Sequence, residues 1–159
     1  MKKIMLILTA ILLVSCSSSQ KTIIAAKKTL KGEWLLNDIS YDRVGTFDVI
    51  LYNDASADCL TGGVWKFIPN NNTGMYTVND SQCVSTGARN FRFTIPEAGQ
   101  DGLYSFLFKP IDEKKKSTNN NKGYRMTLKH LDDTSMIWTQ TVSLEGSPFM
   151  ITMNFNKLQ

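Results

Sequence analysis

Apolar and polar residues alternate along most of the chain after residue 63. In the last such stretch, Phe149, Ile151, Met153 and Phe155 fall on one face and polar residues fall on the other. Alternation with a period of two is typical of β-strands that are buried on one side. The segments that share this pattern are 64–68, 75–78, 91–95, 103–109, 124–131, 136–144 and 149–157. The pattern therefore predicts a protein built mainly from half-buried strands.

The segments between these strands have the composition of turns. Residues 69–74, 96–102, 131–135 and 144–148 are rich in Gly, Asn, Asp and Pro, which favour turn conformations. Short connections of this kind join antiparallel neighbours, and no strand alternates with a predicted helix. With a first strand expected over residues 31–40, the sequence indicates an antiparallel meander rather than a parallel α/β sheet.

Two longer connections interrupt this regular pattern. Residues 41–63 join the first strand to the second, and part of this segment, 46–52, is apolar enough to form a ninth strand. The alternative is a structured loop that folds over one end of the sheet. Residues 112–123 are polar and lysine-rich, and we expect them to form an exposed loop.

The N-terminal segment has a different character. Lys2 and Lys3 precede an unbroken apolar run over residues 4–14. This run is shorter than the roughly 20 residues of a membrane-spanning helix, but it has the length of a secretory signal. It ends in the letters LVSC, which resemble the lipobox of bacterial lipoproteins. The resemblance implies that residues 1–15 are a signal peptide and that Cys16 is acylated. The alternative is a buried N-terminal helix in which the cysteine is incidental.

The lipobox resemblance also predicts where the protein resides. An acylated Cys16 would attach the chain to a lipid bilayer of the cell envelope, expected to be the outer membrane, without spanning it. Residues 16–29 would then form a lipidated, flexible tether, since the segment begins with a run of serines. Within it, the apolar patch Ile23–Ala26 is expected to pack on the domain as a short helix. The folded domain is expected over residues 30–159.

The charge of the chain excludes one class of partner. The formal net charge is +4, and removal of the signal peptide with its two lysines lowers it to about +2. The remaining basic residues are scattered, apart from a short run at 113–117 within the polar loop. Nucleic-acid binding calls for a contiguous basic surface with interleaved aromatic residues, which is not present. We therefore expect no nucleic-acid partner.

Two further cysteines, Cys59 and Cys83, are available once Cys16 is assigned to lipidation. Because a secreted protein folds in an oxidising compartment, they are expected to form a disulfide. The alternative is a metal or redox pair, but there is no CxxC spacing and the single histidine, His130, is distant in sequence. His130 falls beside a turn, where a surface position is expected. No nucleophile elbow or phosphate-binding loop is present, so we predict no catalytic residue, metal site or cofactor.

One set of motifs points to a known family. Gly32 and Trp34, at the start of the first strand, match the Gly-x-Trp motif of lipocalins. A hairpin of the form W-x-F and G-x-Y follows the long loop, and its members are Trp65, Phe67, Gly74 and Tyr76. The chain from about residue 30 resembles the lipocalin-like lipoproteins of Bacteroidota, in which a lipobox and a short tether precede these elements. The resemblance implies an eight-stranded antiparallel up-and-down β-barrel.

Closure of such a barrel makes the first and last strands antiparallel neighbours. Trp34 is then expected near Phe155 and Lys157 at the closed base. Lipocalins lay an arginine of the last strand across this tryptophan, and here Lys157 is expected to take its place. A ninth strand would break the closure, so residues 41–63 are expected to form a loop.

The same strand count places both remaining cysteines at the opposite end, the mouth. Cys59 precedes the second strand and Cys83 follows the third. A disulfide between them would hold the 41–63 loop over the mouth.

The side chains expected to face inward near the mouth are mostly aromatic. They are Leu36, Trp65, Phe91, Phe106, Phe108, Tyr124, Met126, Gln140 and Phe149. Gln140 is the polar member of this set and the best candidate for a polar contact. An apolar pocket with a few polar groups is typical of small-molecule sites. The alternative is that these side chains simply pack as a core.

The sequence thus leaves two main hypotheses on function. The first is a lipoprotein that binds or carries a small hydrophobic ligand in the envelope. The second is a non-catalytic accessory subunit with a solid barrel, whose 41–63 and 112–123 loops dock another envelope protein.

Overall fold

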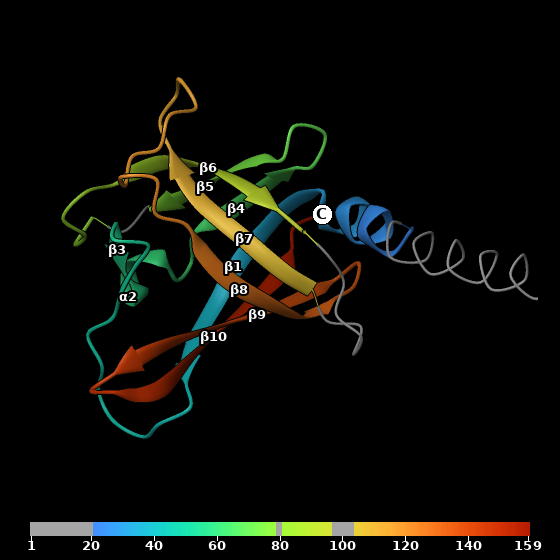
Figure 1. Ribbon diagram of the computed structural model, residues 1–159. Coiled ribbons are helices and arrows are strands. Elements are labelled where there is room, and N and C mark those ends of the chain that lie inside the picture. Colours follow the sequence, from blue (N-terminus) through green and yellow to red (C-terminus); the bar gives the residue numbers. More distant parts are fainter. Residues whose placement is uncertain (1–20, 79–80, 97–103) are drawn as a thin grey trace, which may run out of the picture.

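The computed structural model describes residues 21–78, 81–96 and 104–159 and shows a closed antiparallel barrel (Figure 1). The strands follow the order β1-β10-β9-β8-β7-β6-β5-β4, and β4 pairs with β1 to close the ring. Their bounds are β1 Gly32–Tyr41, β4 Val64–Ile68, β5 Thr73–Val78, β6 Gly87–Thr94, β7 Tyr104–Ile111, β8 Tyr124–Leu131, β9 Ser135–Leu144 and β10 Ser147–Lys157. The predicted eight-stranded up-and-down barrel is confirmed.

The predicted closure between the first and last strands is also confirmed. Trp34 pairs with Lys157 on β10 and with Trp65 on β4, and Leu36 pairs with Phe155. The Lys157 ammonium lies 5.1 Å from the centroid of the Trp34 ring, within the range of a cation–π contact. Gly32 begins the strand with a φ of +122°, which favours glycine.

Residues 41–63 form a structured loop outside the barrel, as predicted, rather than a ninth barrel strand. The loop contains a small hairpin, β2 (Ile50–Leu51) and β3 (Ala55–Ser56), followed by a single helical turn, α2 (Ala57–Leu60). Ser56 caps this turn, since its hydroxyl accepts a hydrogen bond from the Cys59 amide. The hairpin forms its own two-stranded sheet and does not pair with the barrel.

The N-terminal part of the described chain corrects the predicted tether. Residues 21–30 form a helix, so residues 21–29 of the predicted 16–29 tether are helical rather than flexible. Ile23, Ala26 and Leu30 are buried, and their spacing places them on one helical face against the barrel. The helix is therefore longer than the expected Ile23–Ala26 patch. The predicted signal peptide and Cys16 lie outside the described residues.

The end of this helix seals the base of the barrel. The last carbonyl groups of a helix lack partners within the helix. Here the carbonyl of Leu30 accepts the Trp34 indole N–H at 2.9 Å, and the carbonyl of Thr29 accepts the Lys157 ammonium at 2.7 Å. The Gly-x-Trp motif and Lys157 thus join the helix to the first and last strands. Among the described residues no helix is long and apolar enough to cross a membrane.

Candidate functional site

The barrel interior is filled by interlocking aromatic rings at the level of the predicted pocket. Three of these rings, Trp65, Phe91 and Phe108, contact one another, with centroids 4.9 to 5.8 Å apart. The fourth, Tyr124, contacts Phe108 at 6.3 Å. Such distances are typical of packed aromatic pairs. The structure thus brings these four aromatic residues together as one group. All nine residues predicted to face inward are buried except Tyr124, which is half-buried.

Two of the predicted mouth residues lie elsewhere. Phe106 belongs to the layer nearer the base, where its ring contacts Phe93 and Trp138. Phe149 contacts Tyr41 and the loop residue Phe47 instead of the interior group. The reason is that β10 pairs with β1 only as far as Ile151, so Phe149 lies past the barrel rim, on the part of the β9–β10 hairpin that the loop covers. The expectation that these two side chains share the mouth wall was wrong.

Tyr52, which the sequence did not single out, occupies the centre of the mouth. It comes from the turn between β2 and β3, yet only 2% of its surface is exposed. Its ring centroid lies 4.5 Å from that of Phe108, 5.2 Å from that of Tyr124 and 6.0 Å from that of Trp65. The loop therefore does more than cover the barrel, because it inserts a side chain into it.

The turn that carries Tyr52 has an unusual backbone. Tyr52 and Asn53 have φ values of +57° and +56°, and the Asp54 amide donates to the Leu51 carbonyl at 3.0 Å. Positive φ at both central residues is a feature of the type I′ turn of β-hairpins. Asn tolerates this region, whereas for other side chains it costs about 1–2 kcal/mol. Burial of the aromatic ring offsets this strain. The turn-forming letters N and D after Tyr52 are the only sequence signal for this arrangement.

The hydroxyl of Tyr52 has poor hydrogen-bonding partners. Its oxygen lies 3.4 Å from the Met126 sulfur and 3.3 Å from the Met153 sulfur, so its single hydrogen has these two thioethers, which are weak acceptors, to donate to. Burial raises the pKa of this phenol well above its usual value of 10. The side-chain amide of Asn119 connects the turn to the second long loop, because it donates to the Tyr52 carbonyl at 3.5 Å and to the Tyr124 hydroxyl at 2.7 Å.

Three buried polar atoms of the described interior have no hydrogen-bonding partner in the protein. They are the indole nitrogens of Trp65 and Trp138 and the side-chain oxygen of Gln140. Buried polar groups are paired in the great majority of cases, so unpaired ones need an explanation. Gln140, the predicted polar contact, is therefore buried with a free acceptor. It faces Ile151 across the β9–β10 ladder, next to the Met153–Trp138 pair.

A polar hollow of about 420 Å³ lies at the rim of the mouth, and Tyr52, Tyr76 and Asn119 contribute to its lining. Asp54 organises its wall, since it accepts the Tyr76 hydroxyl at 2.7 Å and the Arg89 guanidinium at 3.1 Å. Burial, with the Asp54 contact, raises the pKa of Tyr76 above its usual range. These contacts hold the end of the β2–β3 turn against the barrel strands β5 and β6.

The predicted disulfide is present and lies where the strand count placed it. Cys59 is part of α2, and Cys83 follows β5. The two Cα atoms are 5.9 Å apart, within the range of protein disulfides. The bond connects the end of the 41–63 loop to the barrel.

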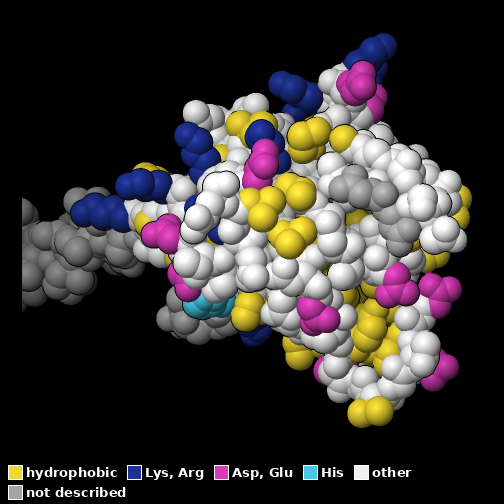
Figure 2. Space-filling model, turned by 180° about the vertical axis from the view of Figure 1, so that it is seen from behind, with side chains coloured by type: hydrophobic (Ala, Val, Ile, Leu, Met, Phe, Trp, Pro, Cys, Tyr) yellow, Lys and Arg dark blue, Asp and Glu magenta, His cyan; other side chains and the backbone are white. Residues whose placement is uncertain are grey.

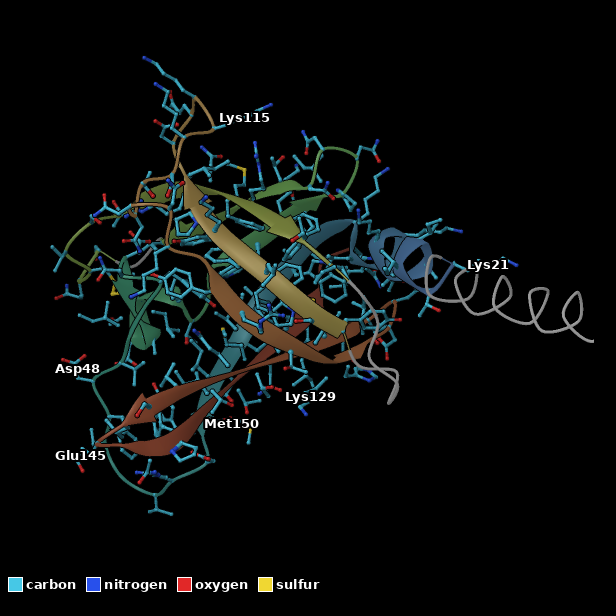
Figure 3. The ribbon with its side chains drawn as sticks, viewed as in Figure 1. Lys21, Asp48, Lys115, Lys129, Glu145 and Met150 are labelled. Atoms are coloured by element: carbon cyan, nitrogen blue, oxygen red, sulfur yellow. A yellow bond between two sulfur atoms is a disulfide. The ribbon has the colours of Figure 1, made fainter. Side chains whose placement is uncertain are left out.

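The outer surface of the mouth end combines acidic and apolar groups. Asp48 in the loop and Glu145 in the β9–β10 turn lie at this end, and Lys21 lies at the opposite end (Figure 3). Val44 and Ile50 are exposed on the loop, and Figure 2 shows apolar side chains framed by acidic ones there. His130 is exposed, as expected, with a ring nitrogen 2.9 Å from the Asp132 carboxylate. Within the three described ranges, no group of His, Cys, Asp or Glu side chains is arranged to hold a metal ion.

Comparisons with known proteins reveal a distant structural likeness. No protein-family model matches the chain, and no curated protein matches it. Among solved structures, a complex of bovine odorant binding protein with a selenium-containing odorant is similar, at 14% sequence identity and a TM-score of 0.43. The match covers 84% of this chain and 73% of that one. A likeness this distant does not bear on function, and the resemblance to lipocalin-like lipoproteins stays a prediction.

Proposed function

We propose that this protein binds a small hydrophobic molecule in the mouth half of its barrel, without catalysis, while an acylated Cys16 holds it on the outer membrane. The observation that carries the proposal is the pair of unpartnered polar atoms on Trp65 and Gln140 inside a largely apolar interior. Small-molecule sites are typically apolar with a few convergent polar groups that orient the ligand. A bound molecule with a polar group would give these atoms the partners that the protein does not.

The binding experiment uses the full chain, extracted from membranes in detergent. Native mass spectrometry would detect and identify a co-purified small molecule. Titration with the apolar fluorescent probe N-phenyl-1-naphthylamine would measure binding in the absence of the natural ligand. We expect saturable binding at one site per chain, together with quenching of tryptophan fluorescence because Trp65 and Trp138 line the interior.

The variant Gln140→Leu separates a binding role of Gln140 from a structural one. Because its oxygen has no protein partner, we expect the replacement to leave the free energy of unfolding unchanged or higher. It should weaken a ligand that bonds to this oxygen by roughly tenfold, about the worth of one buried hydrogen bond. Asn156→Leu, which also replaces a side-chain amide by leucine but on the exposed face of β10, is the control and should alter neither property. Unchanged affinity in Gln140→Leu would count against Gln140 as the polar contact.

The membrane anchor is supported by the lipobox-like sequence that ends at Cys16. Three acyl chains would give stable attachment without a spanning segment. Cys16→Ser should release the protein from the membrane fraction while circular dichroism shows an intact barrel. A variant that still sediments with membranes would contradict the anchor.

A second function, docking to another envelope protein, is favoured by a different observation. The interior is densely packed, whereas the loop carries exposed apolar side chains at Val44 and Ile50. Exposed loops on a rigid scaffold commonly carry recognition. Val44→Asp should abolish capture of a partner in crosslinking from intact cells, and should leave probe binding unchanged. If the same variant loses probe binding but keeps its crosslinks, the docking function is wrong.

A further inference from the structure

The position of Tyr52 defines the kind of molecule that the barrel accepts. We infer that Tyr52 is an internal ligand, whose ring occupies the seat of the bound molecule, and that this molecule is a small planar aromatic compound with a hydroxyl group. The inference rests on the proposed function and specifies the ligand class of the same site.

Tyr52 fills the barrel but is not part of its wall. The inward side chains of the barrel strands are fixed by the alternation of each strand. Tyr52 instead enters from a separate two-stranded hairpin, at a backbone conformation that is unfavourable for an aromatic residue. Backbone strain of this kind is concentrated at ligand clamps and switch regions. The hairpin therefore behaves as an insert that occupies the mouth rather than as a structural support of it.

The seat of Tyr52 is shaped for a flat ring. Phe108, Tyr124 and Trp65 surround it at centroid distances of 4.5 to 6.0 Å, with Phe108 tilted and the other two edge-on. This combination of edge-on and tilted rings is the arrangement that aromatic pairs prefer. A planar aromatic molecule can reproduce these contacts, whereas a saturated ring or an alkyl chain cannot.

The polar groups near the seat suit an entering hydroxyl better than that of Tyr52. The Tyr52 hydroxyl reaches two thioethers, which are weak acceptors. The indole N–H of Trp65, whose ring centroid lies 6.0 Å from that of Tyr52, has no acceptor in the protein. A hydroxyl group is both donor and acceptor, so a phenolic molecule that is free to shift within the seat can satisfy groups that the tethered Tyr52 leaves unpaired.

The contacts of the hairpin indicate how Tyr52 leaves. Each hairpin strand has only two residues, and the Asn119 bond to the Tyr52 carbonyl is long at 3.5 Å. The firmer contacts are those of Asp54 with Tyr76 and Arg89, and the disulfide beyond the hairpin remains as a fixed attachment point. The rim hollow of about 420 Å³ lies beside Tyr52 and gives an entering molecule access from solvent.

The test removes the Tyr52 side chain by mutation and adds the same ring as a free molecule. Tyr52→Gly in the full chain removes the ring, and glycine is well suited to the left-handed φ at this position. The probe is 4-methylphenol, which has the same non-hydrogen atoms as a tyrosine side chain. We expect Tyr52→Gly to unfold at a lower temperature than the wild type, and 4-methylphenol to raise that temperature steadily with its concentration. The non-aromatic analogue 4-methylcyclohexanol should raise it less.

The decisive measurement is made on the wild type. If the mutation alone created the cavity, the wild type would not bind 4-methylphenol at this site. The wild type should bind 4-methylphenol at least about tenfold more weakly than Tyr52→Gly, because the probe must first expel Tyr52. Binding should also speed amide hydrogen exchange over residues 50–56, as the hairpin leaves the mouth. Tyr41→Gly is the matched control, because Tyr41 packs on Phe47 and Phe149 outside the seat. Its unfolding temperature should respond to 4-methylphenol no more than that of the wild type.

Several outcomes would overturn the inference. The first is a Tyr52→Gly protein whose unfolding temperature does not respond to 4-methylphenol, or which stays unfolded with and without it. The second is a Tyr41→Gly protein that responds as much as Tyr52→Gly. The third is a wild type in which 4-methylphenol does not accelerate amide exchange. In each of these cases the proposed function stands if N-phenyl-1-naphthylamine still binds the wild type. Failure of both wild type and Tyr52→Gly to bind any probe contradicts the proposed function itself.

Discussion

Gly74 is a position where a single methyl group should destabilise the barrel. It lies on β5 between Phe67 on β4 and Phe91 on β6, its register partners. A Cβ atom placed on Gly74 would lie 2.3 Å from the Phe91 ring and 2.4 Å from the backbone oxygen of Lys66. Both distances are far below van der Waals contact. The Phe91 ring therefore lies across the glycine, and only a residue without a side chain permits it.

The size of the effect follows from these contacts. An alanine in a strand is better than glycine by about 0.5–1 kcal/mol, because it loses less conformational entropy on folding. Overpacking of a core typically costs about 1–3 kcal/mol. Here the clash includes a backbone oxygen that the ladder holds in place, and the ring is itself packed 4.9 Å from Phe108, so relief is limited. We expect Gly74→Ala to lose about 2 kcal/mol net, or roughly 4–8 °C in unfolding temperature.

The assay is urea unfolding followed by tryptophan fluorescence, since Trp65 lies 5.7 Å from the Phe91 ring. Gly123→Ala is the matched control. Its Cβ would approach nothing closer than the Phe108 carbonyl oxygen at 3.6 Å, an ordinary contact. This variant should be within about 0.5 kcal/mol of the wild type or slightly more stable. If Gly74→Ala is as stable as Gly123→Ala, Phe91 does not lie over Gly74 and the packing described here is wrong.

Three further predictions concern the disulfide and the titrating groups. Replacing Cys59 and Cys83 by alanine should lower the free energy of unfolding by about 3.5 kcal/mol, the chain-entropy value for their separation of 24 residues. In urea titrations, reduction of the disulfide in the wild type should cause the same loss of stability. The Asp132 carboxylate accepts hydrogen bonds from two backbone N–H groups of its turn, and these hold its pKa well below the usual range. This stabilisation is present above the unfolded-state pKa of 3.8 and is lost as the pH falls. The urea stability of Asp132→Asn should therefore depend less on acidic pH than that of the wild type. Tyr52 and Tyr76 have pKa values raised by burial, so stability should fall as the pH rises above about 10, and phenolate absorbance should show both ionising only on unfolding.

The strands could be predicted from the sequence because their side chains follow the barrel wall. Alternation identified each strand where one face is buried, and it missed the first residues of β6. Gly87–Asn90 pair with β5 although they are exposed or only half-buried, so backbone pairing forms the strand there without a hydrophobic pattern. The base could also be predicted, since Trp34 and Lys157 are brought together by closure alone.

The site was harder to predict because its central residue does not belong to the repeating pattern. Periodicity places side chains within a strand, but Tyr52 is placed by a turn whose handedness depends on two consecutive left-handed residues. The positions of Phe106 and Phe149 failed for a related reason. The alternation shows that a side chain faces inward but does not show at which height it lies, which depends on the stagger between strands.

The two ends of the barrel differ in how they are closed, and this difference favours entry of a ligand from the mouth. At the base, three elements meet: the carbonyls at the end of the helix accept the Trp34 indole N–H of β1 and the Lys157 ammonium of β10, and Leu30 is fully buried. Opening this end would break the pairing of the first and last strands, on which the whole barrel depends. At the mouth, the closing group is one side chain on a hairpin that shares no ladder with the barrel, behind a disulfide that keeps the loop attached when the hairpin moves. Motions that open a protein locally are drawn from its least stable elements. A small molecule would therefore exchange through the mouth while the base, next to the proposed membrane anchor, stays closed.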